Sequence, residues 1–352
     1  MHKRQVTLAD IAKKLNISTA TVSRALKNYP DISDETKRRV LALANELNYR
    51  PNSIAAGLRK RESKIIGVII PEIVNHFFSS VIKGIMEVAY DGDYRVMLCQ
   101  SDESFDKEVT DANALFASRV DGLLVSLGHE TKTYEHFLQF QESGIPLVFF
   151  DKVADQLKTS QVIVDDYEGA FQAVSHLISE GCSSIAHFAG PLVASTSRKR
   201  LNGYKDALAH HGISLREEWV IPCEDITLEE GSAFVNRFHK ANNMPEGIFA
   251  ITDSVAIGAI DGLKKLGYQV PSQVAVAGFS DWKISSVINP SLTSVSQPSF
   301  EMGTLAAKIL LEEIQKLKDE EEIEEQVITL KTQLKIRESS LFTTSRVELP
   351  TP

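Results

Sequence analysis

Short β-branched runs alternate with amphipathic stretches from about residue 65 to residue 330. The runs expected to form strands are 65–70, 94–100, 122–126, 147–150, 185–189, 219–221, 248–251, 274–277 and 326–330. The stretches expected to form helices include 76–90, 166–180, 200–211, 228–240, 253–266 and 299–317. This alternation is typical of parallel sheets covered by helices. Two successive sets predict two similar doubly wound subdomains, with a cleft at the carboxyl ends of their strands.

The first fifty residues follow a different pattern, that of three short helices. Thr7 and Asp10 have the spacing of a capping box, and Ser18 and Ser33 are placed to cap the second and third helices. The outward face of the second helix carries small or hydrogen-bonding residues, which are Thr19, Ala20, Thr21, Ser23 and Arg24. Such a face suits contact with base edges and phosphates. We expect a small all-α helix-turn-helix head, although many three-helix bundles do not bind DNA.

The charge of the chain is divided unevenly. Its formal net charge is −9, but residues 1–64 hold 14 Lys and Arg against 6 Asp and Glu. The remaining residues hold 24 Lys and Arg against 41 Asp and Glu. A basic head on an acidic body favours a DNA-binding module joined to a ligand-binding domain. A solvated basic terminus is the alternative.

Composition excludes several classes of protein. A hydrophobic content of 43% with 24% charged residues is typical of a globular chain. The apolar runs, such as 65–70, are far shorter than the ~20 residues that span a bilayer. The start of the chain carries no secretion signal, and its three cysteines are scattered and odd in number. We therefore expect a cytoplasmic protein without a metal, a cofactor or a membrane partner.

Three segments of the N-terminal region carry a family resemblance. They are Val-Thr-Leu-Ala-Asp-Ile-Ala at 6–12, Ser-Thr-Ala-Thr-Val-Ser-Arg-Ala-Leu at 18–26 and Leu-Asn-Tyr-Arg-Pro-Asn at 47–52. They resemble the head of the LacI/GalR family of transcriptional repressors. The resemblance implies that Thr19, Ala20 and Arg24 read bases, while Thr21 and Ser23 hold phosphates. Arg24 is the candidate for a bidentate guanine contact, with a phosphate clamp as the alternative. Thr7 and Ser18 complete the DNA-contacting set of the head.

Residues 51–61 look like a short hinge helix introduced by Pro51. About two turns long and containing Gly57, it should be largely unfolded in isolation. The family pattern Pro-Asn-x-x-Ala-x-x-Leu is intact, and it implies DNA contacts by Asn52, Ala55 and Leu58. The leucine would wedge into the minor groove when two hinge helices pair on DNA. An ordinary linker is the alternative.

The body resembles periplasmic sugar-binding proteins and the sensor domain of the same family along essentially its whole length. The segments 67–78 and 190–204 carry much of this likeness. The residues that the resemblance places around a small effector are Asn75, Phe77, Phe78, Asp151, Arg200, Asp253 and Ser280. Aromatic faces beside carboxylate and guanidinium groups suit a sugar or sugar derivative. The alternatives are core phenylalanines, aspartates that cap helices, and an arginine on the surface.

One position departs from the family pattern. In Gly278-Phe279-Ser280-Asp281, many members carry an aspartate where Ser280 stands. A serine still forms hydrogen bonds but brings no charge, so the effector could differ from the commoner sugars. Asp281 could replace the missing carboxylate after a small shift.

The expected domain boundaries follow from these patterns. A head at 1–50 and a hinge at 51–61 precede a body at 62–340 and a tail at 341–352. Within the body we expect one subdomain of 62–162 with 292–325, and another of 163–291 with 326–340. The tail lacks the leucine heptads by which some family members tetramerise. This favours a homodimer that reads a pseudo-palindromic operator.

Enzyme and transport functions fit the sequence less well. The chain contains no GxxxxGK[ST], HExxH, GxSxG or CxxC motif. A periplasmic transport receptor would share the body but would lack the basic head. We therefore expect a regulator in which the effector alters the rotation of the subdomains and thus the pairing of the hinge helices. Relatives include both effectors that release DNA and effectors that promote binding, and the sequence leaves both open.

Replacing Leu58 with alanine tests the hinge interpretation. Loss of the apolar wedge should weaken operator binding, while effector binding stays intact because the cleft lies in the body. The measurements are DNA titration on a site recovered by in vitro selection and calorimetry with an effector. An equal loss of effector affinity would contradict the hinge role.

Overall fold

The computed structural model describes residues 6–49, 62–74 and 76–342. The chain divides into two compact units, residues 1–63 and 64–352. The predicted hinge helix lies outside the described residues, as does residue 75.

The head consists of three short helices around a small core. They are α1 (Leu8–Leu15), α2 (Thr19–Leu26) and α3 (Asp34–Glu46). The expected capping box is present, with Asp10 accepting the Thr7 backbone N–H at 2.8 Å. Asn16 ends α1 in the left-handed conformation, at φ 53°. Ile11, Val22 and Val40 are fully buried at the centre of the core.

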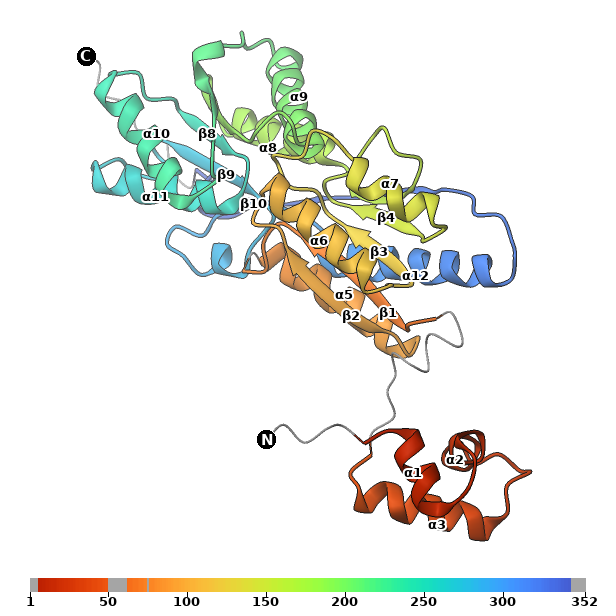
Figure 1. Cartoon of the computed structure of the whole chain (residues 1–352). Helices are drawn as coiled ribbons and strands as arrows, with labels where there is room; N and C mark the ends of the chain where they lie inside the picture. The colour runs from red at the N-terminus through yellow and green to blue at the C-terminus, as the bar shows by residue number, and fades with distance from the viewer. Residues whose placement is uncertain (1–5, 50–61, 75, 343–352) are drawn as a thin grey trace. The chain divides into compact units, whose positions relative to one another are not determined.

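The first subdomain of the body contains a six-stranded, fully parallel sheet. Its strands are β1 (Ile65–Ile70), β2 (Arg95–Gln100), β3 (Gly122–Val125), β4 (Leu147–Phe150), β5 (Ser160–Val164) and β11 (Val327–Leu330), in the order β11-β5-β4-β3-β1-β2. Helices α5 (His76–Asp91) and α12 (Ser299–Lys318) pack together on one face. Helices α6 (Phe105–Ala117) and α7 (Glu135–Glu142) cover the other face (Figure 1).

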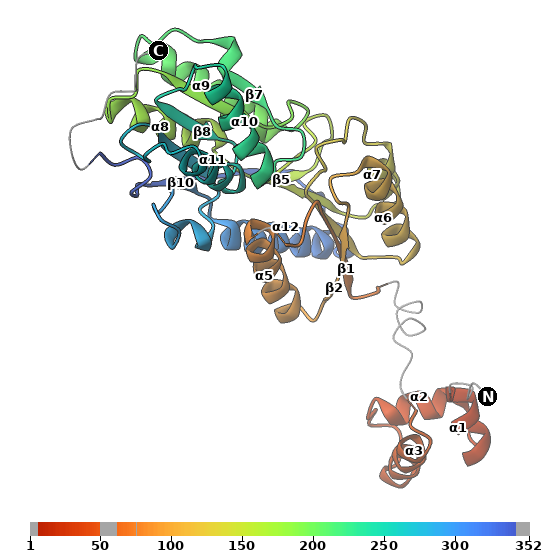
Figure 2. The same ribbon diagram turned by 90° about the vertical axis from the view of Figure 1, so that its left-hand side faces the viewer.

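The second subdomain repeats this design. Its strands are β6 (Ile185–Ala189), β7 (Val220–Pro222), β8 (Gly247–Ala250), β9 (Ala275–Phe279), β10 (Thr293–Ser296) and β12 (Gln333–Lys335), in the order β12-β10-β9-β8-β6-β7. Only β12 runs antiparallel within this sheet as described. Helices α8 (Asp166–Ser179) and α9 (Ser195–His210) cover one face, and α10 (Leu228–Lys240) and α11 (Asp253–Lys265) cover the other (Figure 2).

This architecture confirms the expected fold class of a helical head and two doubly wound α/β subdomains. The expected subdomain boundaries, however, are wrong at two of the three crossings. Strand β10, at 293–296, belongs to the second sheet because it pairs with β9. Strand β11, at 327–330, belongs to the first sheet because it pairs with β5. The chain therefore crosses near residues 165, 297 and 331, and local hydrophobic patterns do not reveal which sheet a short strand joins.

None of the helices in the described part of the chain combines the length and hydropathy that a bilayer crossing requires.

Close approach between α10 and α11 depends on two glycines. A Cβ atom added at Gly258 would lie 1.9 Å from the carbonyl oxygen of Leu228. One added at Gly231 would lie 2.1 Å from the carbonyl oxygen of Val255. Both obstacles are backbone atoms, which cannot rotate away as a side chain can. The two helix axes can therefore approach this closely only with glycine at the crossing.

Replacing Gly258 with alanine should lower the stability of the body. Because the obstacle is backbone, the methyl group would force α10 and α11 apart at a cost near the upper end of about 1–3 kcal/mol, which outweighs the ~1 kcal/mol that alanine contributes to helix propensity. Urea denaturation measures the difference in the free energy of unfolding. Lys265→Ala is the control, because it removes only an exposed ion pair with Asp261 on the same helix. Unchanged or increased stability of the Gly258 variant would contradict the close packing.

Candidate functional site

The carboxyl ends of the parallel strands of both sheets face a cavity of about 390 Å³ between the two subdomains. Segments that follow β1, β2, β3 and β4 form one wall, and segments that follow β6 to β10 form the other. A volume of this size lies in the range of small-molecule sites. The topology thus produces the cleft expected from the alternating pattern of strands and helices.

Phe77 and Phe78 line the cavity at the start of α5. Their rings meet edge to face, with centroids 5.1 Å apart and planes at 77°. Both side chains are buried, at 6% and 5% exposure. They therefore form a rigid apolar wall against which the face of a ring could pack.

Glu103 and Lys152 form an ion pair on the same side of the cavity. The Lys152 Nζ atom lies 2.6 and 2.8 Å from the two carboxylate oxygens of Glu103. The backbone N–H of His129 donates to the same carboxylate at 2.7 Å. Burial raises the pKa of Glu103, but the Lys152 charge and the hydrogen bonds from His129 and Lys152 outweigh it and lower the pKa to about 2. Glu103 is therefore ionised at neutral pH and neutralises Lys152.

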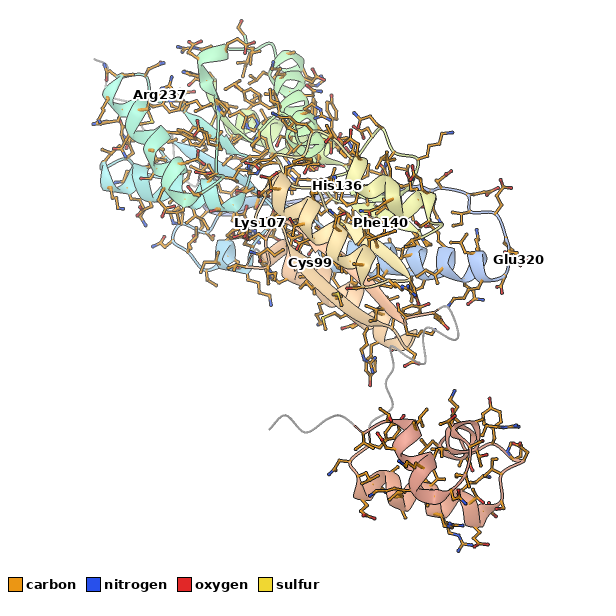
Figure 3. All side chains as sticks on the ribbon, in the orientation of Figure 1. Cys99, Lys107, His136, Phe140, Arg237 and Glu320 are labelled. Carbon is orange, nitrogen blue, oxygen red and sulfur yellow. The ribbon has the colours of Figure 1, made fainter. Side chains whose placement is uncertain are left out.

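A buried carboxylate, that of Glu108, holds the loop that carries His129. Glu108 of α6 accepts from the Gly128 backbone at 2.9 Å and from the Thr131 hydroxyl at 2.9 Å. His136, labelled in Figure 3, lies 3.0 Å from the same carboxylate through its Nε2 atom. These contacts tie α6, α7 and the loop after β3 together. Glu108 thereby fixes the position of His129 at the cavity.

Asp151 follows β4 and faces the cavity in the left-handed conformation, at φ 59°. Among the described residues its carboxylate accepts one hydrogen bond, from Ser126 Oγ at 3.3 Å. Burial raises its pKa from 3.8 to about 6, helped by Asp166 and opposed by Lys152 and Arg200. The carboxylate thus retains acceptor capacity toward the cavity.

Arg200 reaches the cavity from α9 with most of its guanidinium already engaged. Its Nε and Nη2 atoms each lie 2.8 Å from Asp166, and Nη1 donates to the Ile251 carbonyl at 2.7 Å. The guanidinium also stacks 3.6 Å from the ring centroid of Phe279. Burial raises the pKa of Asp166, and the charge and hydrogen bonds of Arg200 oppose that rise. The arginine is fixed in place before any ligand arrives.

Asp253 does not have the role expected from the sequence. It is fully buried, does not line the cavity, and accepts hydrogen bonds from Trp282 N at 2.7 Å, from Ser285 Oγ at 2.6 Å and from Ser294 Oγ. Burial raises its pKa to about 6, against these hydrogen bonds. Its carboxylate braces the loop after β9 instead of accepting ligand hydroxyls, because protein donors already surround it.

Ser280 lies at the cavity, and its hydroxyl donates to Gln297 Oε1 at 2.9 Å. Asp281 does not replace the missing carboxylate, because it forms an ion pair with Arg337 at 2.6 Å and does not line the cavity. Asn75 lies outside the described residues. The structure thus places Phe77, Phe78, Asp151, Arg200 and Ser280 around one cavity.

Sequence reasoning missed several polar groups of this cavity. Thr252 Oγ1, Trp282 Nε1 and Gln297 Nε2 line it, and these buried atoms have no hydrogen-bond partner within the described chain. Thr252 and Trp282 follow strands that the pattern did predict, so their place at the carboxyl edge of the sheet could have been inferred from the sequence. Gln297 follows β10, a strand that the pattern did not predict.

The exposed side of α2 carries the residues expected to read DNA. Thr19, Ala20 and Arg24 are exposed, whereas Thr21 and Ser23 are half-buried. Arg24 forms an ion pair with Asp31, and its guanidinium lies 5.4 Å from the Tyr29 ring centroid. An exposed ion pair of this kind contributes only about 0–1 kcal/mol to stability. It therefore orders the Arg24 side chain but leaves it available for contact with DNA.

Two residues expected to contact DNA, Thr7 and Ser18, are the N-caps of α1 and α2. The hydroxyl groups of Thr7 and Ser18 accept the backbone N–H groups of Asp10 at 3.3 Å and Thr21 at 3.0 Å. Both therefore place a helix N-terminus, which favours phosphate binding, at the surface of the head. Asn52, Ala55 and Leu58 lie outside the described residues.

Comparison with known proteins identifies the family. A family model described as bacterial regulatory proteins, lacI family, matches residues 7–52. A second, described as periplasmic binding proteins and sugar binding domain of LacI family, matches residues 63–338. The chain belongs to the LacI family. It is a DNA-binding transcription regulator, as the resemblance of its motifs predicted.

Similar LacI-family members cover nearly the whole chain. Catabolite control protein A of Priestia megaterium is 32% identical over 336 residues, which is 95% of this chain and 99% of that protein. The repressor CytR of Escherichia coli is 32% identical, covering 88% of this chain and 90% of its own length. The lac repressor dimer bound to operator and the anti-inducer ONPF matches with a TM-score of 0.81 and 25% identity, covering 96% of this chain and 100% of that chain.

Within residues 6–49, 62–74 and 76–342, no three His, Cys, Asp or Glu side chains converge as the ligands of a metal ion would.

Replacing Asp151 with asparagine should stabilise the protein at neutral pH. The native pKa of about 6, above its ordinary value of 3.8, means that the folded state holds this proton more tightly than the unfolded state. Wild-type stability therefore falls as the pH rises from about 4 through about 6, by up to about 3 kcal/mol. Asparagine avoids this loss and tolerates the left-handed conformation.

Urea denaturation at several pH values measures this effect. The advantage of Asp151→Asn should be largest above pH 6 and disappear below pH 4. Asp225→Asn, at the exposed rim of the cavity, is the matched control and should change little. A less stable Asp151 variant above pH 6 would show that the ionised carboxylate is stabilised by the fold.

Proposed function

We propose that the protein is a homodimeric repressor whose operator affinity is controlled by a sugar or sugar derivative bound between its two subdomains. The observation that carries this proposal is the cavity at the carboxyl ends of both sheets. A rigid aromatic wall lines this cavity together with a carboxylate, Asp151, and a fixed guanidinium, Arg200. Apolar ring faces and a hydroxyl rim are the features of a sugar that such a site recognises.

Solved structures of similar regulators support a sugar effector. A regulator named CelR in complex with cellobiose matches with a TM-score of 0.72 and 26% identity. A LacI-family regulator from Enterococcus faecium with bound ribose matches with a TM-score of 0.69 and 26% identity. The similar protein of Halalkalibacterium halodurans is named ribose operon repressor. We extend this class of effector to the present chain.

The three crossings between the subdomains would couple effector binding to the relative rotation of the subdomains. Near the first and third crossings the Asp165 backbone N–H donates to the Leu330 carbonyl at 3.0 Å. At the second, Gln297 connects β10 to α12 and also lines the cavity. An effector that contacts both walls stabilises one relative rotation over another, and differential affinity of this kind is what shifts a conformational equilibrium. The hinge helices would respond to that rotation.

A homodimer is supported by the outer face of α5. Met86 and Tyr90 are 54% and 74% exposed there, beside a shallow groove that Ile82 also lines. Exposed apolar stripes of this kind mark protein–protein interfaces. The similar lac repressor structure is named as a dimer bound to operator. Two heads in a dimer would read two half-sites related by a two-fold axis.

Arg24→Ala tests DNA recognition directly. Losing a bidentate base contact should weaken binding to an in vitro selected operator by roughly tenfold to a hundredfold, about 1–3 kcal/mol, with a smaller loss on scrambled DNA. Fluorescence anisotropy over a series of salt concentrations provides both affinities and the salt slope. The wild-type slope should be steep because the basic head releases counterions from DNA.

Lys27→Ala is the matched control, since Lys27 is exposed at the end of the same helix. A phosphate contact there would weaken selected and scrambled DNA alike. Equal losses on both DNAs for the Arg24 variant would assign Arg24 to the backbone instead of to the bases. A salt-insensitive complex would contradict DNA binding by the basic head.

A further inference from the structure

The cations that line the cavity already have protein counterions. In the described part of the chain the lining includes two Lys or Arg side chains, Lys152 and Arg200. Lys152 is paired with Glu103 at 2.6 Å, and Arg200 is paired with Asp166 at 2.8 Å. The low pKa of Glu103, about 2, keeps the first of these pairs ionised at neutral pH. Neither cation is available to neutralise a ligand.

Further carboxylates surround the same cavity. Asp151 lies in its wall, and Glu72, Asp225 and Glu229 lie at its exposed parts, on both subdomains. Together with the neutralised cations they leave the lining with a net negative charge. An anionic ligand would have to lose its hydration beside these groups, which is costly without a free positive partner.

Two helix N-termini at the cavity, those of α5 and α9, favour negative charge, and their effect is weaker than that of the carboxylates. The first turns of both helices carry no acidic residue, and Phe77 and Phe78 of α5 and Thr196 and Ser197 of α9 line the cavity. A helix N-terminus supplies about half a positive charge, which falls off within the first turn. That is enough to orient a hydroxyl or ring oxygen, but it does not balance the carboxylates around it.

The donors that remain for a ligand are neutral. Trp282 Nε1 and Gln297 Nε2 are buried at the cavity and have no partner within the described residues. Gln297 is 7% exposed, and its Oε1 atom is held by the Ser280 hydroxyl, so its amide nitrogen is the group left over. Buried unpaired donors are costly unless a ligand or a water satisfies them. They call for oxygen or nitrogen acceptors on an uncharged molecule.

We propose that the effector is an uncharged, hydroxyl-rich molecule, and that the cleft excludes phosphorylated or carboxylated ligands because Glu103 and Asp166 mask its two cations. Acceptors of the ligand would face Trp282 and Gln297, and a hydroxyl would donate to Asp151. The proposal rests on the cleft being the effector site. Glu103 is the specificity-determining residue, since it masks the lysine nearest to Asp151 in the chain.

Calorimetric titration of the full chain with matched pairs tests this selectivity. The pairs are ribose and ribose 5-phosphate, glucose and glucose 6-phosphate, and uridine and uridine 5′-monophosphate. In each pair that gives binding, the uncharged member should bind at least about tenfold more tightly. A phosphate buried in the cleft without a free positive partner loses at least that factor in affinity. Tighter binding of a phosphate ester in any pair would overturn the proposal.

A second experiment does not depend on the identity of the effector. Inorganic phosphate is titrated into wild type and Glu103→Gln, with sodium chloride at matched ionic strength as the reference. The substitution frees Lys152, so phosphate should raise the melting temperature of Glu103→Gln more than that of wild type. Adding Lys152→Met to Glu103→Gln should abolish this gain. Phosphate bound by the basic head affects wild type and every variant equally and cancels in the comparison.

The outcomes of this experiment decide the proposal by themselves. An absence of extra stabilisation by phosphate in Glu103→Gln would overturn it, because removing Glu103 would then not free a cation. Greater stabilisation by phosphate of wild type than of the single variant Lys152→Met would also overturn it, because Lys152 would then already be available in wild type. Glu229→Gln, which alters a rim carboxylate that has no contact with Lys152 in the structure, should show no comparable gain. Operator binding is measured separately, so a failure of this inference leaves the DNA-binding proposal standing.

Discussion

The parallel strands of two sheets built from one chain constrain everything else in the body. A parallel strand must be followed by a crossover, so all the described strands except the antiparallel β12 end at the same edge of their sheet. Because the chain passes between the subdomains near residues 165, 297 and 331, the carboxyl edges of the two sheets face each other. Loops with no sequence similarity thereby meet at one cavity. The location of the site therefore follows from the direction of the strands, and the side chains determine only what it binds.

Close packing of the helices makes this arrangement rigid within each subdomain. The α10–α11 crossing admits only glycine at Gly231 and Gly258, where backbone atoms approach to within contact distance. Rigid subdomains joined by three short crossings concentrate motion at the crossings. A ligand that touches both walls can then bias the relative rotation of the whole subdomains instead of deforming one of them.

The charged groups of the cleft are of two kinds, those paired within the protein and those available to a ligand. The buried pairs Lys152–Glu103 and Arg200–Asp166 fix two long side chains in place. Fixed cations of this kind contribute shape and hydrogen bonds, but their charge is already balanced. What the cleft retains for recognition is an aromatic wall, the Asp151 carboxylate and neutral donors. The replacement of aspartate by serine at Ser280 fits this pattern, because Ser280 orients Gln297 through a hydrogen bond.

The sequence by itself determined the family, the head and the general architecture. Helix caps such as Thr7 and Ser18, and apolar periods of 3.6 or 2 residues, are local properties, so they could be read without a structure. Strand β1 matches its predicted bounds at Ile65–Ile70 for the same reason. Tertiary structure alone decided which sheet receives β10 and β11, that Asp253 is a brace, and that Glu103 masks Lys152. Each of these depends on partners far apart in the sequence, and local pattern carries no information about which distant groups will meet.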